Sequence, residues 1–127
     1  MPQRLDDPTI GDDEILWRRI RPEWLHRESS GQVRPGSFAF IDRLTGEVSV
    51  HIASIMRDSN LALEGHPDDN LAAIRAGHPR SLGYAIVRDP KPDDSSHALI
   101  CPSPNQGDAR KIAKQAMWVV RRNPSPS

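Results

Sequence analysis

The last third of the chain, residues 80–122, restricts the possible fold more than any other part. It contains an apolar segment at 81–88, an acidic proline-containing turn at 89–94, a second apolar segment at 97–101 and an amphipathic segment from Asp108 onward. Two short apolar segments separated by a turn rich in Pro and Asp are typical of a β-hairpin. We therefore predict two antiparallel strands followed by a C-terminal helix.

The predicted C-terminal helix has one apolar face and one basic face. Its apolar residues recur at spacings of three and four, which is the period of a helix that packs on a sheet. They are Ala109, Ile112, Ala113, Ala116, Met117 and Val120. Asp108 at the start and Arg121 and Arg122 at the end complement the helix dipole, so the helix is expected to cover residues 108–122.

Three earlier segments have the composition of strands. They are residues 15–20, 37–41 and 47–52. In the last of these, Val48, Val50 and Ile52 alternate with polar residues. This alternation is the pattern of a strand with one buried face and one solvated face.

A short helix is predicted over residues 68–76, because Asp68 or Asp69 can cap its start and Gly77 suits its end. The elements together predict an α+β fold. A mostly antiparallel sheet of about five strands is packed by the C-terminal amphipathic helix and by the short helix. A doubly wound α/β sheet would need full-length helices between its strands, and the first half of the chain lacks them.

The length of 127 residues suits one domain with a modest core. We predict an acidic flexible tail at residues 1–13, a single α+β domain at 14–122 and a disordered C-terminal end at 123–127. Lys and Arg together number 17, and so do Asp and Glu. The chain therefore has no overall charge that would attract nucleic acid or an anionic membrane.

The sequence predicts a protein of the reducing cytoplasm that does not bind membranes. Cys101 is its single cysteine, so no disulfide can form within the chain. No apolar run approaches the ~20 residues that span a bilayer. The acidic N-terminus also lacks the apolar block of a signal peptide.

The candidate catalytic residues are His97, His51, Ser49 and Arg19, which all lie on predicted strands. Histidine is the usual carrier of acid–base chemistry near neutral pH, although solvated histidines on a sheet are also common. None of the five histidines forms an HxH or HExxH motif, so no metal site is predicted. Cys101 lies four residues after His97, which is about 13 Å along a strand, too far for a nucleophile and base to meet.

A ligand-binding site is predicted at the turn that joins the last two strands. In a hairpin of simple register, Arg88, Asp89 and His97 would gather at one edge of the sheet. A guanidinium, a carboxylate and an imidazole together can bind a phosphate or another small polar ligand. The alternative is a turn stabilised only by ion pairs.

The basic face of the predicted C-terminal helix is a candidate nucleic-acid or partner-binding patch. Its residues are Arg110, Lys111, Lys114, Trp118 and Arg121. Cations beside an aromatic ring suit a nucleic acid, although most exposed basic helix faces are simply solvated. The acidic tail could fold back over this helix or bind a basic partner.

Several short motifs recur in order along the chain. They are Trp17-Arg18-Arg19-Ile20, Phe38-Ala39-Phe40, Val48-Ser49-Val50, Arg80, Arg88-Asp89-Pro90, His97-Ala98-Leu99-Ile100 and the basic closing helix. In these motifs, over residues 14–120, the chain resembles a group of small uncharacterised bacterial proteins. The resemblance implies a bacterial source and no known activity.

Arg19 and Ser49 also resemble the arginine on an early strand and the serine on a later strand of ADP-ribosyltransferase-like toxins, which consume NAD. The chain departs from that pattern because no strand glutamate follows, and Glu64 lies in a predicted loop. This departure counts against an NAD-consuming activity, and no cofactor is predicted.

The first functional prediction is a small non-enzymatic interaction protein, an accessory subunit that binds another protein. The alternative is a small enzyme, or a ligand-binding relative of one, that acts on a nucleotide or nucleic acid. Its site would use Arg19, Ser49, His51, Arg88 and His97. The two predictions differ in geometry, because the second requires these side chains to line one pocket.

Overall fold

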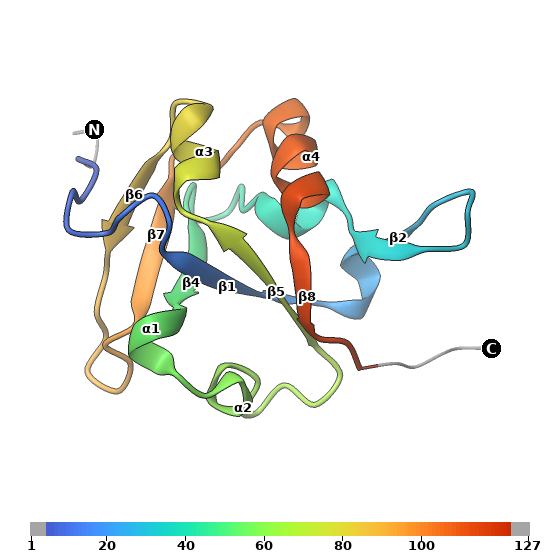
Figure 1. Cartoon of the computed structure of the whole chain (residues 1–127), viewed down its shortest axis with the longest axis horizontal. Coiled ribbons are helices and arrows are strands. Elements are labelled where there is room, and N and C mark those ends of the chain that lie inside the picture. Colours follow the sequence, from blue (N-terminus) through green and yellow to red (C-terminus); the bar gives the residue numbers. More distant parts are fainter. Residues whose placement is uncertain (1–4, 123–127) are drawn as a thin grey trace.

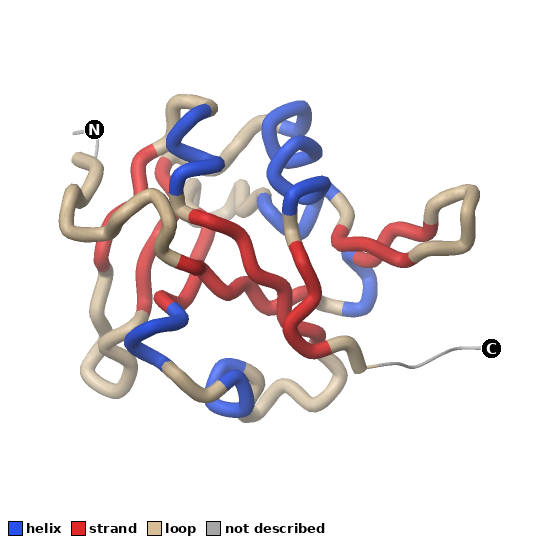
Figure 2. The backbone as a smooth tube through the Cα atoms, in the orientation of Figure 1, coloured by secondary structure: helices blue, strands red, loops and turns tan. Residues whose placement is uncertain are grey.

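The computed structural model describes residues 5–122, and in this part of the chain six strands form one antiparallel sheet (Figures 1 and 2). The strands lie in the order β6-β7-β4-β1-β5-β8. Their bounds are β1 (Ile15–Ile20), β4 (Val48–Ile52), β5 (Asn70–Arg75), β6 (Ala85–Arg88), β7 (His97–Cys101) and β8 (Met117–Val120). The α+β class and the mostly antiparallel sheet predicted from the sequence are confirmed.

A two-stranded hairpin and several short helices surround this sheet. The hairpin projects from the body of the protein on the side of α4 (Figure 1). It pairs β2 (Leu25–Arg27) with β3 (Val33–Pro35). The helices are η1 (Pro22–Trp24), η2 (Ser37–Phe40), α1 (Ala53–Met56), α2 (Ser59–Ala62), α3 (Gly77–Ser81) and α4 (Gln106–Gln115), where η denotes a 3-10 helix. None of the helices described is long and apolar enough to cross a bilayer.

The main core lies between one face of the sheet and the helices α4 and η2. Strand β4 buries Val48, Val50 and Ile52 on this face, as the alternation in the sequence predicts. Helix α4 buries Ala109, Ile112 and Ala113 against them. Burial of apolar side chains is the dominant stabilising term, at about 25 cal/mol per Å² removed from water.

The second face of the sheet is only partly covered. Helices α1 and α2 place Met56 and Ala62 over this face, where they pack with Trp17 and Leu71 in a smaller apolar cluster. Beside this cluster β4 presents His51, which lies between the buried residues Val50 and Ile52 and therefore points to the opposite face. The uncovered part of this face is polar.

The predicted C-terminal helix ends earlier than expected. Helix α4 stops at Gln115, Ala116 has extended backbone angles, and the chain continues as the edge strand β8. The aromatic and β-branched residues Trp118, Val119 and Val120 favour a strand over a helix. The indole N–H of Trp118 also donates to the Val33 carbonyl at 3.1 Å, which ties β8 to the hairpin.

Two other local predictions are wrong. Residues 68–76 do not form a helix, because β5 pairs along its whole length with β1 and lies inside the sheet. A short apolar run buried by tertiary pairing cannot be distinguished from a helix by its periodicity. Residues 37–41 do not form a strand, because η2 occupies most of this segment and packs against α4.

Residues 6–9 lie along the outer edge of β6, and residue 12 contacts α3. The Asp7 amide donates to the Ile86 carbonyl at 2.8 Å, and the Asp6 carboxylate accepts from the Ile86 amide at 2.8 Å. Arg80 in α3 binds Asp6 and the Asp7 carbonyl, while Ile10 is fully buried. This N-terminal segment therefore contacts β6 and α3. The mobility predicted for residues 1–13 stays a prediction, and the C-terminal end at 123–127 lies outside the described residues.

Candidate functional site

The cleft that we describe as the candidate site lies where strands β1 and β4 diverge. These strands pair at only two positions, Leu16 with Ile52 and Trp17 with His51. Strand β1 nevertheless continues to Ile20, paired with β5 on its other side, and β4 keeps its pairing with β7. The divergence leaves an opening between two strands that are each held in the sheet by another neighbour.

The side chain of Arg18 fills the bottom of this opening. Its Nε donates to the Ala39 carbonyl at 2.8 Å, and its Nη1 donates to the Ser49 carbonyl at 2.9 Å. The second bond satisfies a carbonyl that β1 would otherwise pair in a continuous sheet. Burial, aided by the charge of Arg19, lowers the pKa of Arg18 to about 10, so the guanidinium is still charged at neutral pH.

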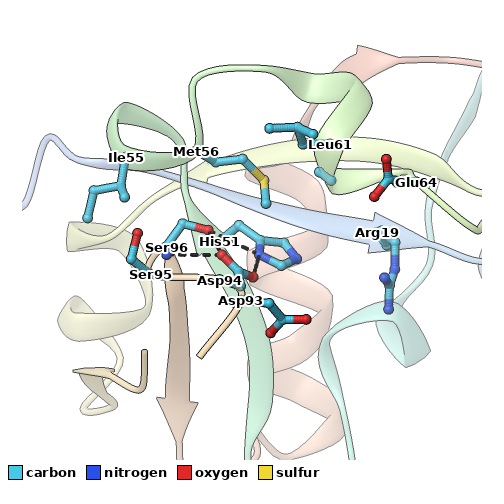
Figure 3. A pocket seen from close by; sticks show the side chains of 11 residues that line it. Arg19, His51, Ile55, Met56, Leu61, Glu64, Asp93, Asp94, Ser95 and Ser96 are labelled. Carbon is cyan, nitrogen blue, oxygen red and sulfur yellow. Dashed lines mark hydrogen bonds and ion pairs between the residues drawn. The ribbon is translucent and has the colours of Figure 1, made fainter. Parts of the chain in front are cut away.

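Above Arg18 lies an open cleft of about 470 Å³ that contains all four of the predicted catalytic residues. It is lined by Arg18, Arg19, Arg21, Trp24, Asp42, Ser49, His51, Asp69, Lys91, Asp93, Asp94 and His97. An adjoining hollow shares Arg19, His51, Asp93 and Asp94 with this cleft and extends under α1 and α2 (Figure 3). The sequence therefore identified four residues of one cleft: Arg19, Ser49, His51 and His97.

His51 is held by a carboxylate from the turn that precedes β7. Its Nδ1 lies 3.0 Å from Asp94 Oδ2 (Figure 3). Asp94 also accepts hydrogen bonds from the amide and the hydroxyl of Ser96. A carboxylate at Nδ1 favours the tautomer with its proton there, which leaves Nε2 of the neutral ring as a proton acceptor.

His97 has the same arrangement with the other end of the turn. Its Nδ1 lies 3.0 Å from Asp89 Oδ2 and 3.0 Å from the Asp89 carbonyl oxygen. His51 and His97 are directly opposite each other on β4 and β7, and their ring centroids are 6.0 Å apart with an edge-to-face angle of 76°. Two imidazoles are thus oriented side by side, each by one carboxylate.

The environment gives His51 and Asp94 different charge states. Burial lowers the pKa of His51, and the charges of His97 and Arg19 add to this effect, while Asp94 opposes it. Burial alone would raise the pKa of Asp94, but the hydrogen bonds from Ser96 and the charges of both histidines outweigh it and lower this pKa. At neutral pH His51 is therefore mainly a neutral base beside an ionised carboxylate.

Ser96 positions Asp94 and is not a nucleophile. It is 1% exposed, and its hydroxyl donates to Asp94. It lies 3.4 Å from Nδ1 of His51, the ring nitrogen that already faces the carboxylate. In a serine–histidine–aspartate triad the serine and the carboxylate contact opposite ring nitrogens, so this arrangement is different.

Arg88 does not join the predicted ligand site. The register pairs Arg88 with Ala98, so its side chain points to the face opposite that of His97. Its Nε lies 3.4 Å from Asp7 Oδ2 and 3.2 Å from the Thr9 hydroxyl, at the outer edge of β6. The predicted cluster of Arg88, Asp89 and His97 is therefore corrected to Asp89 and His97 alone.

The predicted basic patch is divided between two places. Arg110 and Lys114 of α4 line a groove against the β2–β3 hairpin, whereas Lys111 lies outside it. Trp118 and Arg121 follow the end of the helix, where the Arg121 guanidinium lies 5.4 Å from the Trp118 ring centroid. The early end of α4 is the physical reason for this division.

Lys91, Arg21 and Trp24 also line the cleft and were not predicted from the sequence, and neither was the contact of Asp94 with His51. Asp94 was placed in the acidic turn at the edge of the sheet, and it does lie in a turn, where it contacts His51 of β4. A usable signal was present: the acidic turn immediately precedes a strand that starts with histidine. No local pattern in the sequence predicts that β7 pairs with β4, which lies nearly fifty residues earlier.

Comparisons of the chain with protein-family models, curated proteins and solved structures find no match. The geometry of the cleft is therefore the basis for inferring a function. Among residues 5–122, no three His, Cys, Asp or Glu side chains are grouped as potential ligands of a metal ion.

Proposed function

We propose that the cleft binds a phosphate group of a nucleotide or nucleic acid and that His51 and His97 act on it as general base and general acid. The observation that carries this proposal is the pair of imidazoles, 6.0 Å apart, whose Nδ1 atoms each contact a carboxylate of the same turn. Two oriented imidazoles, one accepting and one donating a proton, are suited to general acid–base catalysis.

The cations of the cleft supply the phosphate-binding groups. Arg19, Arg21 and Lys91 line it, and guanidinium and ammonium groups both bind phosphate oxygens. Arg19 lies 3.8 Å from Asp69, and Lys91 lies 3.0 Å from Asp89, so each is held near the histidines by a carboxylate. Ser49 is exposed on the same face and offers a hydroxyl to the ligand.

The balance of charge makes phosphate binding depend on histidine protonation. The cleft is lined by four cations and by four carboxylates, the latter being Asp42, Asp69, Asp93 and Asp94. Asp89, whose carboxylate lies 3.0 Å from both His97 and Lys91, adds a fifth carboxylate beside the cleft. Each histidine that gains a proton therefore makes the site more positive by one charge. An anion should therefore bind more tightly as a histidine gains its proton.

Binding can be tested by following the histidine ring signals by NMR while adenosine 5′-monophosphate is added. The proposal predicts saturable shifts of the His51 and His97 signals and little change for His78, which lies outside the cleft beside the Lys111 carbonyl. Arg19→Gln should weaken the binding. Arg75→Gln is the matched control, because Arg75 is exposed on the neighbouring strand. Equal shifts of all three histidines, or none, would contradict the proposal.

We also propose, from an independent observation, that a protein partner in the cytoplasm binds the open edge of β8. This edge strand exposes Met117, which is 72% accessible, and Val119. Among residues 5–122, no strand pairs with the outer edge of β8. Such an edge with apolar side chains suits the addition of a strand from another protein. A stoichiometric partner that binds the wild type and not Met117→Asp, while His51→Gln retains it, would support this role. A partner retained equally by Met117→Asp would contradict it.

A further inference from the structure

Trp24 connects the cleft to a second hollow on the surface. Its ring lines the cleft, and it also lines a small hollow with Phe38, Ile41 and Arg43. Phe38 is 57% exposed, although Ala39 and Phe40, which follow it in the chain, are fully buried. Exposed aromatic rings next to a site are typical of a ligand-binding surface.

The cleft, the hollow at Trp24 and Phe38, and a third hollow together form a path that leads away from the histidines. Ser37, which directly precedes Phe38, borders a groove between helix α4 and the β2–β3 hairpin. The groove is also lined by His26, Arg34, Arg110 and Lys114, with Glu28 as its one carboxylate. It is therefore basic.

The path is positive in a chain that has no net charge. The two hollows beyond Trp24 are lined by four cations, Arg34, Arg43, Arg110 and Lys114, against a single carboxylate. That carboxylate, Glu28, already faces Arg34 at 3.7 Å. The whole chain has 17 cationic and 17 acidic residues, so its acidic groups are concentrated elsewhere. A local positive stripe attracts a polyanion even when the net charge is zero.

Resting on the proposed function, we infer that the substrate is single-stranded RNA, which passes from the cleft over Trp24 and Phe38 into the groove between α4 and the hairpin. Cations that follow the phosphates, interrupted by aromatic rings on which bases stack, are the means by which proteins hold single strands. A duplex would keep its bases stacked on one another and away from these rings.

The contacts of Trp24 fit this role. The guanidinium groups of Arg18 and Arg21 each lie 5.2 Å from its ring centroid. Arg18 is fixed by its two carbonyl acceptors and so holds the indole in place. Arg21 is exposed and can exchange its contact with the indole for a phosphate, which leaves the ring open to a base.

RNA also supplies a nucleophile that the two histidines can activate. Nε2 of His51 takes the proton of a ribose 2′-hydroxyl, and the 2′ oxygen forms a bond to the adjacent phosphorus. The bond from phosphorus to the 5′ oxygen breaks, and Nε2 of His97 gives its proton to that leaving oxygen. The products are a 2′,3′-cyclic phosphate and a 5′-hydroxyl end, and no other reactant is consumed. DNA lacks the 2′-hydroxyl, so it should bind without being cleaved.

The test uses the full chain, a fluorescent single-stranded RNA octamer and the DNA octamer of the same sequence. Anisotropy measures binding, and gel electrophoresis with mass spectrometry identifies the cleaved ends. We expect cleavage of RNA alone, with cyclic phosphate ends. His97→Ala, purified in the same way, should lack this cleavage, which excludes a contaminating nuclease. Cleavage of DNA at an equal rate would overturn the proposed reaction.

Variants along the path test the route of the strand. The double exchange Arg110→Glu and Lys114→Glu should weaken RNA binding by at least tenfold. It should also reduce the slope of log binding constant against log salt concentration by about 1.4 in magnitude, since each phosphate contact on a single strand contributes about 0.7 to this slope. Phe38→Ala should weaken binding by about tenfold through lost stacking. Lys111→Glu is the matched control, because it reverses a charge on the same helix outside the groove. Circular dichroism and thermal melting check that each variant is folded.

The outcomes separate this inference from the proposed function. If adenosine monophosphate still binds at His51 and His97 but the octamer binds no tighter, and the groove variants change nothing, the RNA path is wrong and the phosphate site remains. If neither the mononucleotide nor the octamer shifts the histidine signals, the phosphate site itself is wrong.

Discussion

The exchange Asp94→Asn is the most informative single perturbation of the candidate site. Asp94 contacts Nδ1 of His51 at 3.0 Å and accepts two hydrogen bonds from Ser96. The carbonyl oxygen of an asparagine can keep both bonds from Ser96, which directs its amide N–H group toward His51. Since an amide N–H can only donate, Nδ1 must become the acceptor, and the ring proton must move to Nε2.

Two effects of different size follow from this change. The folded state loses one charge-assisted hydrogen bond at a carboxylate that is 22% exposed, which should cost about 1–2 kcal/mol of stability. The chemical effect is larger, because a proton on Nε2 prevents this atom from acting as a base. Cleavage of the RNA octamer should fall by about 10²–10⁴-fold, the usual contribution of general acid–base catalysis.

The assay combines two measurements on one protein. Long-range proton–nitrogen NMR should show the His51 proton on Nδ1 in the wild type and on Nε2 in Asp94→Asn, while urea unfolding reports the stability. Asp93→Asn is the matched control, because Asp93 lines the same cleft and its exchange removes the same charge. An unchanged tautomer, or an equal loss of cleavage in both variants, would refute the positioning role of Asp94.

Three further predictions concern stability and can be checked by urea unfolding. Ile10→Ala should lower the free energy of unfolding by about 2–4 kcal/mol, because Ile10 is fully buried. Leu5→Ala, at an 86% exposed position, should leave this free energy almost unchanged. Equal effects of the two exchanges would support a flexible tail. Arg18→Met should cost about 2–4 kcal/mol because two carbonyls lose their donor, and no loss would contradict the bridging role. The folded-state pKa values of His51 and Asp94 lie below their unfolded values of 6.5 and 3.8, so the unfolded state binds more protons on acidification. The stability contribution of His51 should be complete above pH 6.5 and should decline as the pH falls through its folded pKa. The contribution of Asp94 should decline below pH 3.8. The exchange His51→Gln should remove the decline that is due to His51.

The parts of the fold with local signals could be predicted from the sequence. The hairpin of β6 and β7 follows from its Pro- and Asp-rich turn, and the start of α4 follows from the capping and apolar period near Asp108, with Asn105 accepting from the Asp108 amide at 2.8 Å. Strand β5 could not be predicted, because its short apolar run becomes a strand only through pairing with β1 on one side and β8 on the other.

The site was predictable in its residues and not in its contacts. The polar alternation of β4 identified Ser49 and His51 as a solvated pair, and the acidic turn before His97 suggested a ligand site. The face-to-face placement of His51 and His97 depends on the pairing of β4 with β7, which no local pattern encodes. The error at Arg88 arose from one residue of register, which moves a side chain to the other face of a sheet.

His51 and His97 are proposed to form one coupled pair around a single phosphate. The most direct test is an NMR titration with pH of the His51 ring in the wild type and in His97→Gln, each with and without inorganic phosphate. The charge of His97 is one of the causes that lower the pKa of His51, so His97→Gln should raise it. Bound phosphate should raise the pKa of His51 in the wild type as well. A His51 pKa that neither the exchange nor the phosphate changes would contradict the account.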